Sequence, residues 1–72
     1  MMLDMYVVYD HPTDFPNHFV VRHWIIGAGR AKPTDRCVIG KTLDEVRTAI
    51  PAYCVRLERS PEDEPQVLES WV

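Results

Sequence analysis

Five residues in this chain are of types that bind transition metals, three histidines and two cysteines: His11, His18, His23, Cys37 and Cys54. None of them falls in the C-x-x-C or H-x-x-x-H spacing of a metal motif. His18 and His23 are five residues apart in an extended stretch, so their side chains point to opposite faces. Asp10 and Asp14, which flank His11, suit a turn in which side chains cap backbone groups. We therefore predict no metal site.

Cysteine and histidine can also form a nucleophilic pair, with His23 as the base for Cys37 or Cys54. The sequence leaves this pairing open. Each cysteine is followed by valine in an extended stretch, where cysteine usually behaves as a small buried hydrophobe, and buried thiols are inert. A chain this short also offers little concave volume for a substrate. We therefore predict a protein that is not an enzyme and is not built on disulfides.

A glycine-rich stretch at residues 25–32, I-I-G-A-G-R-A-K, begins like the phosphate-binding turn of a dinucleotide fold. The third glycine position of that motif holds Lys32, Pro33 follows at once, and no helix comes next to complete the site. We interpret residues 27–35 as a flexible connection and predict no cofactor.

Charge is unevenly distributed along the chain, whose formal net charge is −3. The acidic residues concentrate near the C-terminus: Glu58, Glu62, Asp63, Glu64 and Glu69. The segment from Arg30 to Lys41 is basic, and Arg30, Lys32 and Arg36 could contact phosphate groups, with Trp24 nearby as a stacking surface. A nucleic-acid contact through this segment is the alternative function, although the negative net charge opposes it.

The elements that must position these residues belong to one small domain. The chain has 72 residues, of which 46% are apolar and 10% aromatic, enough for a packed core. No apolar run approaches the roughly 20 residues of a membrane span, and the first residues lack the basic segment of a signal peptide. We expect a single cytoplasmic domain spanning residues 1–72.

Residues 42–50 predict the one long helix. Thr42 followed by Glu45 is a capping box, in which the hydroxyl accepts from a first-turn N–H and the carboxylate reaches back to the Thr42 amide. Pro51 disfavours helical geometry in the preceding residue and ends the helix. Spacings of three and four place three apolar side chains in one stripe: Leu43, Val46 and Ile50.

The rest of the chain predicts strands at residues 5–9, 18–26, 53–59 and 66–72, with a short strand or extended lead at 37–39. Turn-forming residues separate them at 10–17 and 60–65. Alternation points Tyr53, Val55 and Leu57 inward, whereas the last strand has two equally apolar faces, Val67 and Trp71 against Leu68 and Val72. The predicted fold class is α+β, a ββαββ arrangement with a mostly antiparallel four-stranded sheet and one helix packed on one face.

One helix is too narrow to cover both faces of such a sheet. Alternation in the strand 18–26 directs one set of side chains to the core: Phe19, Val21, His23 and Ile25. The other set, bordered by Arg56, predicts a protein-binding surface centred on an aromatic anchor: Val20, Arg22, Trp24 and Ile26. We expect a homodimer formed through this open face or through an edge strand. The alternative is a monomer in which residues 27–35 cover Trp24.

Three segments resemble a group of small hypothetical proteins of bacteria and their prophages: Y-V-V-Y-D-H-P-T-D-F-P-N-H-F-V-V-R, T-L-D-E-V-R-T-A-I-P and S-P-E-D-E-P-Q-V-L-E-S-W-V. Together they cover most of the chain. The resemblance implies no activity, cofactor or catalytic residue. It implies an accessory, phage-derived gene product, which favours an interaction module that inhibits or adapts a larger bacterial protein.

Overall fold

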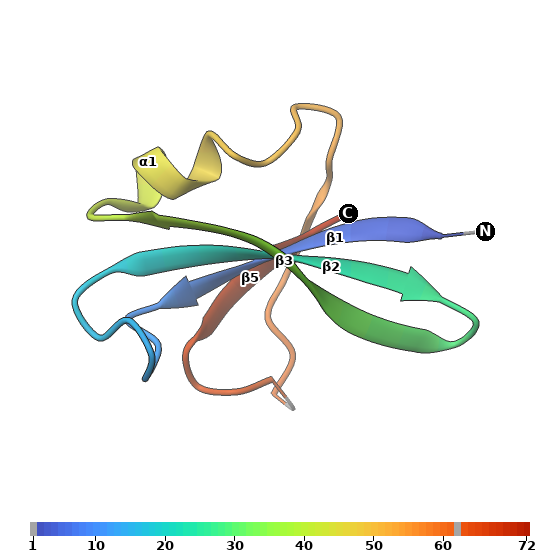
Figure 1. Ribbon diagram of the computed structural model, residues 1–72, viewed down its shortest axis with the longest axis horizontal. Coiled ribbons are helices and arrows are strands. Elements are labelled where there is room, and N and C mark those ends of the chain that lie inside the picture. The colour runs from blue at the N-terminus through green and yellow to red at the C-terminus, as the bar shows by residue number, and fades with distance from the viewer. Residues whose placement is uncertain (1, 62) are drawn as a thin grey trace.

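A computed structural model describes residues 2–61 and 63–72, which fold into an antiparallel sheet and one short helix (Figure 1). The elements in chain order are β1 (Leu3–Asp10), β2 (Phe19–Gly27), β3 (Arg30–Gly40), α1 (Leu43–Arg47), β4 (Arg56–Leu57) and β5 (Val67–Trp71). The strands are arranged in the order β3-β2-β1-β5-β4. The α+β class and the antiparallel sheet are confirmed. Glu62, which belongs to the predicted acidic turn, lies outside the described residues.

The described residues contain five strands rather than the predicted four, because residues 27–35 are not a flexible connection. β2 and β3 form a hairpin in which Gly27 pairs with Arg30. Ala28 and Gly29 make the turn between them with positive φ angles of 52° and 75°. A two-residue turn with two positive φ angles matches the twist of the strands that it joins. Pro33 is tolerated within β3 because that strand lies at the edge of the sheet.

The helix α1 begins where it was predicted but ends after Arg47. Thr42 caps it, since its hydroxyl accepts a hydrogen bond from the Glu45 amide at 3.2 Å. The Glu45 carboxylate accepts from the Lys41 amide instead of the predicted Thr42 amide. Beyond Arg47 the chain tightens into turns before it reaches Pro51, and the Ala49 and Ile50 amides each donate to the carbonyl three residues back. Residues 48–50 are therefore turn and not helix.

The side of the sheet that faces α1 holds the main core. Tyr6, Val8, Val21 and Val46 form a buried cluster. Partly buried residues pack around it, including the predicted stripe of α1: Phe19, Leu43, Ile50, Cys54, Leu68 and Trp71. The core-facing assignment of Phe19 and Val21 and the inward stripe of the helix are confirmed.

A β-bulge decides which residues of β5 face the core, a question that its two equally apolar faces left open in the sequence. Val8 pairs with Glu69 and Tyr9 pairs with Val67, which leaves Leu68 as an extra residue between them. Leu68 and Trp71 consequently both pack toward the core under α1. Val67, opposite Tyr9, lies on the other face and is buried there.

The predicted strand 53–59 shrinks to the two residues of β4, which pair only with the end of β5. Tyr53, Val55 and Leu57 were predicted to point inward, but they are 76%, 65% and 45% exposed. Alternation is not sufficient to bury a strand when no second element covers it. No helix among the described residues is long and apolar enough to cross a membrane.

Candidate functional site

The predicted open face of the sheet is not open. In Figure 1, α1 lies above the sheet, whereas two connecting segments, residues 11–18 and residues 58–61 with 63–66, lie below it. Val20 on this lower face is fully buried, as are most of Val7 and Val67. A hollow of about 500 Å³ remains between the two segments and the sheet, and Arg22 and Trp24 line it. Val20 therefore cannot belong to an exposed binding patch.

The other residues of the predicted binding surface are paired, partly buried or on the opposite face of the sheet. Arg22 forms an ion pair with Asp14. Trp24 and Ile26 are each partly buried. Arg56 lies on the opposite face of the sheet, where its Nε is 3.5 Å from the Glu69 carboxylate. The structure brings Arg22 and Trp24 together but does not place Arg56 at their border. Pro12, Thr13, Asp14, Glu64 and Gln66 line the hollow with Trp24, and so does Pro33, its cross-strand partner from the segment 27–35.

The Trp24 indole nitrogen is buried without a hydrogen-bond partner among the described residues. The indole N–H approaches the Tyr9 phenol, although the two do not meet hydrogen-bond geometry. Burial raises the pKa of Tyr9, and the neighbouring indole N–H opposes that rise. Both side chains are packing groups of the lower face rather than a ready-made aromatic anchor.

A buried ion cluster, which the sequence analysis missed, fastens α1 and β4 to β5. Glu69 is only 2% exposed, and its carboxylate accepts hydrogen bonds from Arg47 and from the Trp71 indole, each at 2.5 Å. Burial alone would raise the pKa of Glu69, but the hydrogen bonds from Arg47 and Trp71 outweigh it and lower the pKa. The single acidic residue in the apolar run Q-V-L-E-S-W-V was the available signal, because an acid in such a run needs a cationic partner.

His23 lies between a carboxylate and a hydroxyl. Its Nε2 is 2.8 Å from Asp4 Oδ1 and its Nδ1 is 2.9 Å from Thr34 Oγ1. The Thr34 hydroxyl also accepts from the Arg36 amide at 3.2 Å and contacts the His23 carbonyl at 3.1 Å. The contacts of this hydroxyl hold the backbone of β3 in place, so we interpret the arrangement as a structural clamp and not as a catalytic triad.

The Cys–His pair that the sequence left open is not assembled. Both ring nitrogens of His23 are occupied by Asp4 and Thr34, so no thiol is activated by this imidazole. Cys37 is exposed, contrary to the expectation of a buried side chain, and Cys54 is partly buried; both are free thiols. Among residues 2–61 and 63–72, no three histidine, cysteine or acidic side chains gather closely enough to hold a metal ion.

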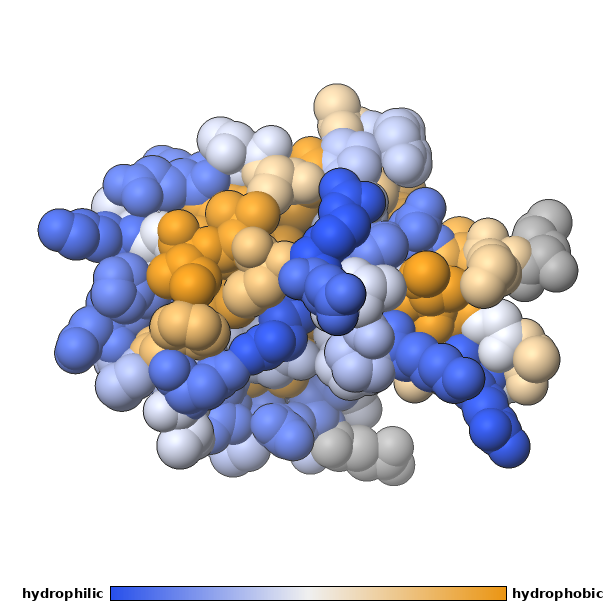
Figure 2. Space-filling model, in the orientation of Figure 1, coloured by the Kyte–Doolittle hydropathy of each residue, from blue (hydrophilic) through white to orange (hydrophobic). Residues whose placement is uncertain are grey.

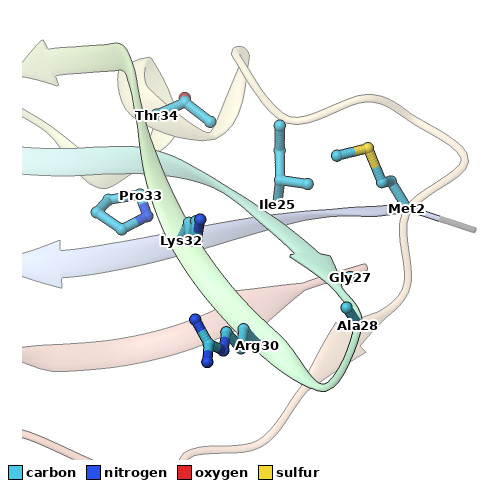
Figure 3. Close-up of a pocket in the computed structure, with 8 residues that line it drawn as sticks. All are labelled: Met2, Ile25, Gly27, Ala28, Arg30, Lys32, Pro33 and Thr34. Carbon is cyan, nitrogen blue, oxygen red and sulfur yellow. The ribbon is translucent and has the colours of Figure 1, made fainter.

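β3 carries the predicted phosphate-contact residues, Arg30, Lys32 and Arg36. Arg30 and Lys32 line a hollow of about 520 Å³ near the hairpin turn, but Arg36 does not (Figure 3). In that view Met2, Ile25 and Thr34 lie on one side of β3, whereas the Arg30 guanidinium points away from them. The hollow is mainly apolar.

The outer edge of β3 pairs with no other strand in the described part of the chain, and it is the longest such edge of the sheet. Opposite His23 the register shifts, so residues 34–36 bulge out between the regular pairs Trp24–Pro33 and Arg22–Cys37. From Cys37 to Gly40 the strand is regular again. Along this half Cys37 is exposed, Val38 is 41% exposed and Ile39 is 43% exposed. We refer to residues 36–40 as the open segment.

Apolar surface gathers around the open segment. Figure 2 shows an apolar area where β3 runs beside α1, separated by hydrophilic residues from a second one near the N-terminus. Four basic side chains without a carboxylate partner among the described residues also lie on β3 or directly after it: Arg30, Lys32, Arg36 and Lys41. The remaining arginines bond to carboxylates or, in Arg59, to backbone carbonyls.

No protein-family model matches this chain, and neither a curated protein nor a solved structure matches it. The geometry therefore defines a small α+β domain with one long sheet edge that is basic in its first half and apolar in its second.

Proposed function

We propose that this protein is an interaction module without enzymatic activity that forms a homodimer through the open segment of β3. The observation that carries the proposal is the exposed apolar pair Val38 and Ile39 on a sheet edge that no described strand covers. An unpaired edge with apolar side chains is a template for another strand, because its backbone N–H and C=O groups are already held in an extended row.

The rest of the sheet perimeter is protected against such pairing, which supports the choice of the open segment. The opposite edge strand, β4, has two residues and offers little backbone. The first half of β3 contains Pro33, two cations and the bulge at 34–36, all of which discourage edge pairing. The second half has none of these features between Cys37 and Gly40. A partner strand therefore has one favourable place to add.

The same edge suits the wider role that we propose, that of a phage-derived inhibitor or adaptor of a larger bacterial protein. Strand addition gives affinity through the backbone and leaves specificity to the side chains on each face. On the open segment these are Val38 on the α1 side, opposite Val21, and Cys37 and Ile39 on the other side.

Sedimentation velocity of wild type, Ile39→Lys and Leu57→Lys tests the proposal. A lysine on an edge strand opposes pairing, so we expect Ile39→Lys to sediment as a monomer at concentrations where wild type is a dimer. Leu57 is the matched control, since it is 45% exposed on the opposite edge strand and Ile39 is 43% exposed. Leu57→Lys should remain dimeric, and circular dichroism should show both variants folded. A monomeric wild type at high micromolar concentration contradicts the proposal.

A further inference from the structure

The two ends of the open segment limit how a second copy can pair with it. At one end, Pro33 has no N–H, and the Arg36 amide is already donated to Thr34 Oγ1 at 3.2 Å. At the other end β3 stops at Gly40, and the Lys41 amide is donated to the Glu45 carboxylate at 3.2 Å. The backbone available for a regular ladder is thus confined between these two tied amides.

Symmetry restricts the pairing further. Two copies joined edge to edge by antiparallel strands are related by a two-fold axis perpendicular to the sheet, so facing residues lie on the same face. One residue must then lie directly opposite its own copy, and the axis passes midway between the two; we say that the axis passes through that residue. The open segment offers three central residues: Cys37, Val38 and Ile39.

We propose that the axis passes through Val38, an inference that rests on the proposed function. With Cys37 at the centre, Asp35 of the bulge would lie opposite the apolar Ile39 of the second copy. With Ile39 at the centre, only residues 38–40 would pair before β3 ends at Gly40. With Val38 at the centre, the whole open segment pairs with the open segment of the second copy.

The side chains are complementary in this register. Val38 lies opposite Val38 of the second copy, and Cys37 lies opposite Ile39, so apolar groups cover apolar groups. Just outside the ladder Asp35 comes opposite Lys41, and neither of them has an ion-pair partner among the described residues. The arrangement occurs twice by symmetry, which places an apolar centre between two ion pairs.

The register also accounts for the basic half of β3. Antiparallel pairing directs residues 30–34 of one copy toward the end of the second copy where α1 begins. The first turn of α1 is acidic, with Asp44 and Glu45. Opposite charges therefore approach each other at both ends of the dimer, and the two copies of α1 lie on the same face of one continuous sheet.

Disulfide trapping tests the register in a Cys37→Ser, Cys54→Ser background, first shown to be dimeric by sedimentation velocity. Two single cysteines are compared under mild oxidation, Val38→Cys and Ile39→Cys. Directly facing residues have Cα atoms about 5 Å apart. Ile39 and its copy, offset by two residues, would be about 8 Å apart. A disulfide requires less than about 7 Å, so we expect Val38→Cys to convert to covalent dimer and Ile39→Cys to remain largely monomeric on a non-reducing gel.

The outcomes separate the register from the proposed function. If Ile39→Cys cross-links as completely as Val38→Cys, or if a dimeric background yields no covalent dimer with either cysteine, the axis at Val38 is wrong while self-association stands. If both the background and the wild type sediment as monomers, the proposed function itself fails, and the register with it.

Discussion

At the scale of single residues, buried polar groups connect elements that the small hydrophobic core holds weakly. Glu69 joins Arg47 of α1 and Arg56 of β4 to β5, and His23 joins Asp4 of β1 to Thr34 of β3. Each cluster spans elements that are distant in sequence. The buried charge of Glu69 is tolerable because Arg47 supplies hydrogen bonds as well as opposite charge.

Glu69 makes stability depend on pH. Its pKa is lower in the folded protein than the ordinary value of 4.5, because hydrogen bonds from Arg47 and Trp71 overcome the effect of burial. The folded state therefore holds the ionised form more strongly than the unfolded state does. The stabilisation is complete above pH 4.5 and is lost as the pH falls through the lowered folded-state pKa.

Urea denaturation of wild type and Glu69→Gln from neutral to acidic pH measures this contribution. We expect Glu69→Gln to lower the free energy of unfolding at neutral pH by about 1.5–3 kcal/mol, the range for hydrogen bonds to a charged group. Its stability should then fall less steeply than that of wild type below pH 4.5. Glu58→Gln, at an exposed position, is the control and should behave as wild type. Identical pH dependences for wild type and Glu69→Gln would show that this carboxylate does not couple folding to protons.

At the scale of elements, α1 is short and depends on its cap and on one side chain. It has five residues, fewer than an isolated helix needs, so tertiary packing must supply most of its stability. Val46 is fully buried in the core beneath it. A Cβ placed on Gly40 would lie 2.9 Å from Val46 Cγ1, so the end of β3 must be glycine for α1 to pack this closely.

We expect Val46→Ala to lower the free energy of unfolding by about 2 kcal/mol or more, through lost burial and the cavity left behind. Thr42→Ala should cost about 1 kcal/mol, because the Glu45 amide loses its acceptor. Chemical denaturation measures both. Thr13→Ala, an exposed threonine in the β1–β2 connection, is the matched control and should be close to neutral. A neutral Val46→Ala would mean that α1 does not pack on the sheet through this residue.

At the scale of the whole molecule, charge is segregated. The protein has a formal net charge of −3, yet four of the basic side chains that lack carboxylate partners in the described residues lie on or just after β3. A basic strand edge on an acidic protein is the feature that supports nucleic-acid contact as the alternative function. In the dimer that we propose, this basic half instead approaches the acidic start of α1.

Fluorescence anisotropy with labelled DNA and RNA distinguishes these two roles of the basic half of β3. We expect no significant binding by wild type at physiological salt, since the net charge repels phosphate. Sub-micromolar binding that weakens steeply with salt, and that is lost when Arg30, Lys32 and Arg36 are replaced by serine, would establish the alternative function. Sedimentation of the same triple variant supplies the control, because the central residues of the open segment, Cys37, Val38 and Ile39, are unchanged and it should still dimerise.

Local spacing along the chain determined the features that depend on neighbouring residues. The Thr42 cap, the inward stripe of α1 and the core-facing alternation of Phe19 and Val21 all follow from short-range geometry, and all were predicted. The α+β class followed from the same patterns. The proposed partner, the location in the cell and the resemblance to prophage proteins remain predictions, since neither the fold nor the comparisons test them.

Tertiary structure decided what depends on residues far apart in sequence. A stretch rich in glycine and proline became β3 because β2 lay beside it to supply hydrogen bonds. Val20 became fully buried on the lower face of the sheet, whereas Leu57 stayed 45% exposed on the short edge strand β4. Alternation states which side chains share a face, but burial requires something to cover that face. That covering is a property of the folded chain, and it moved the candidate site from Trp24 to the edge of β3.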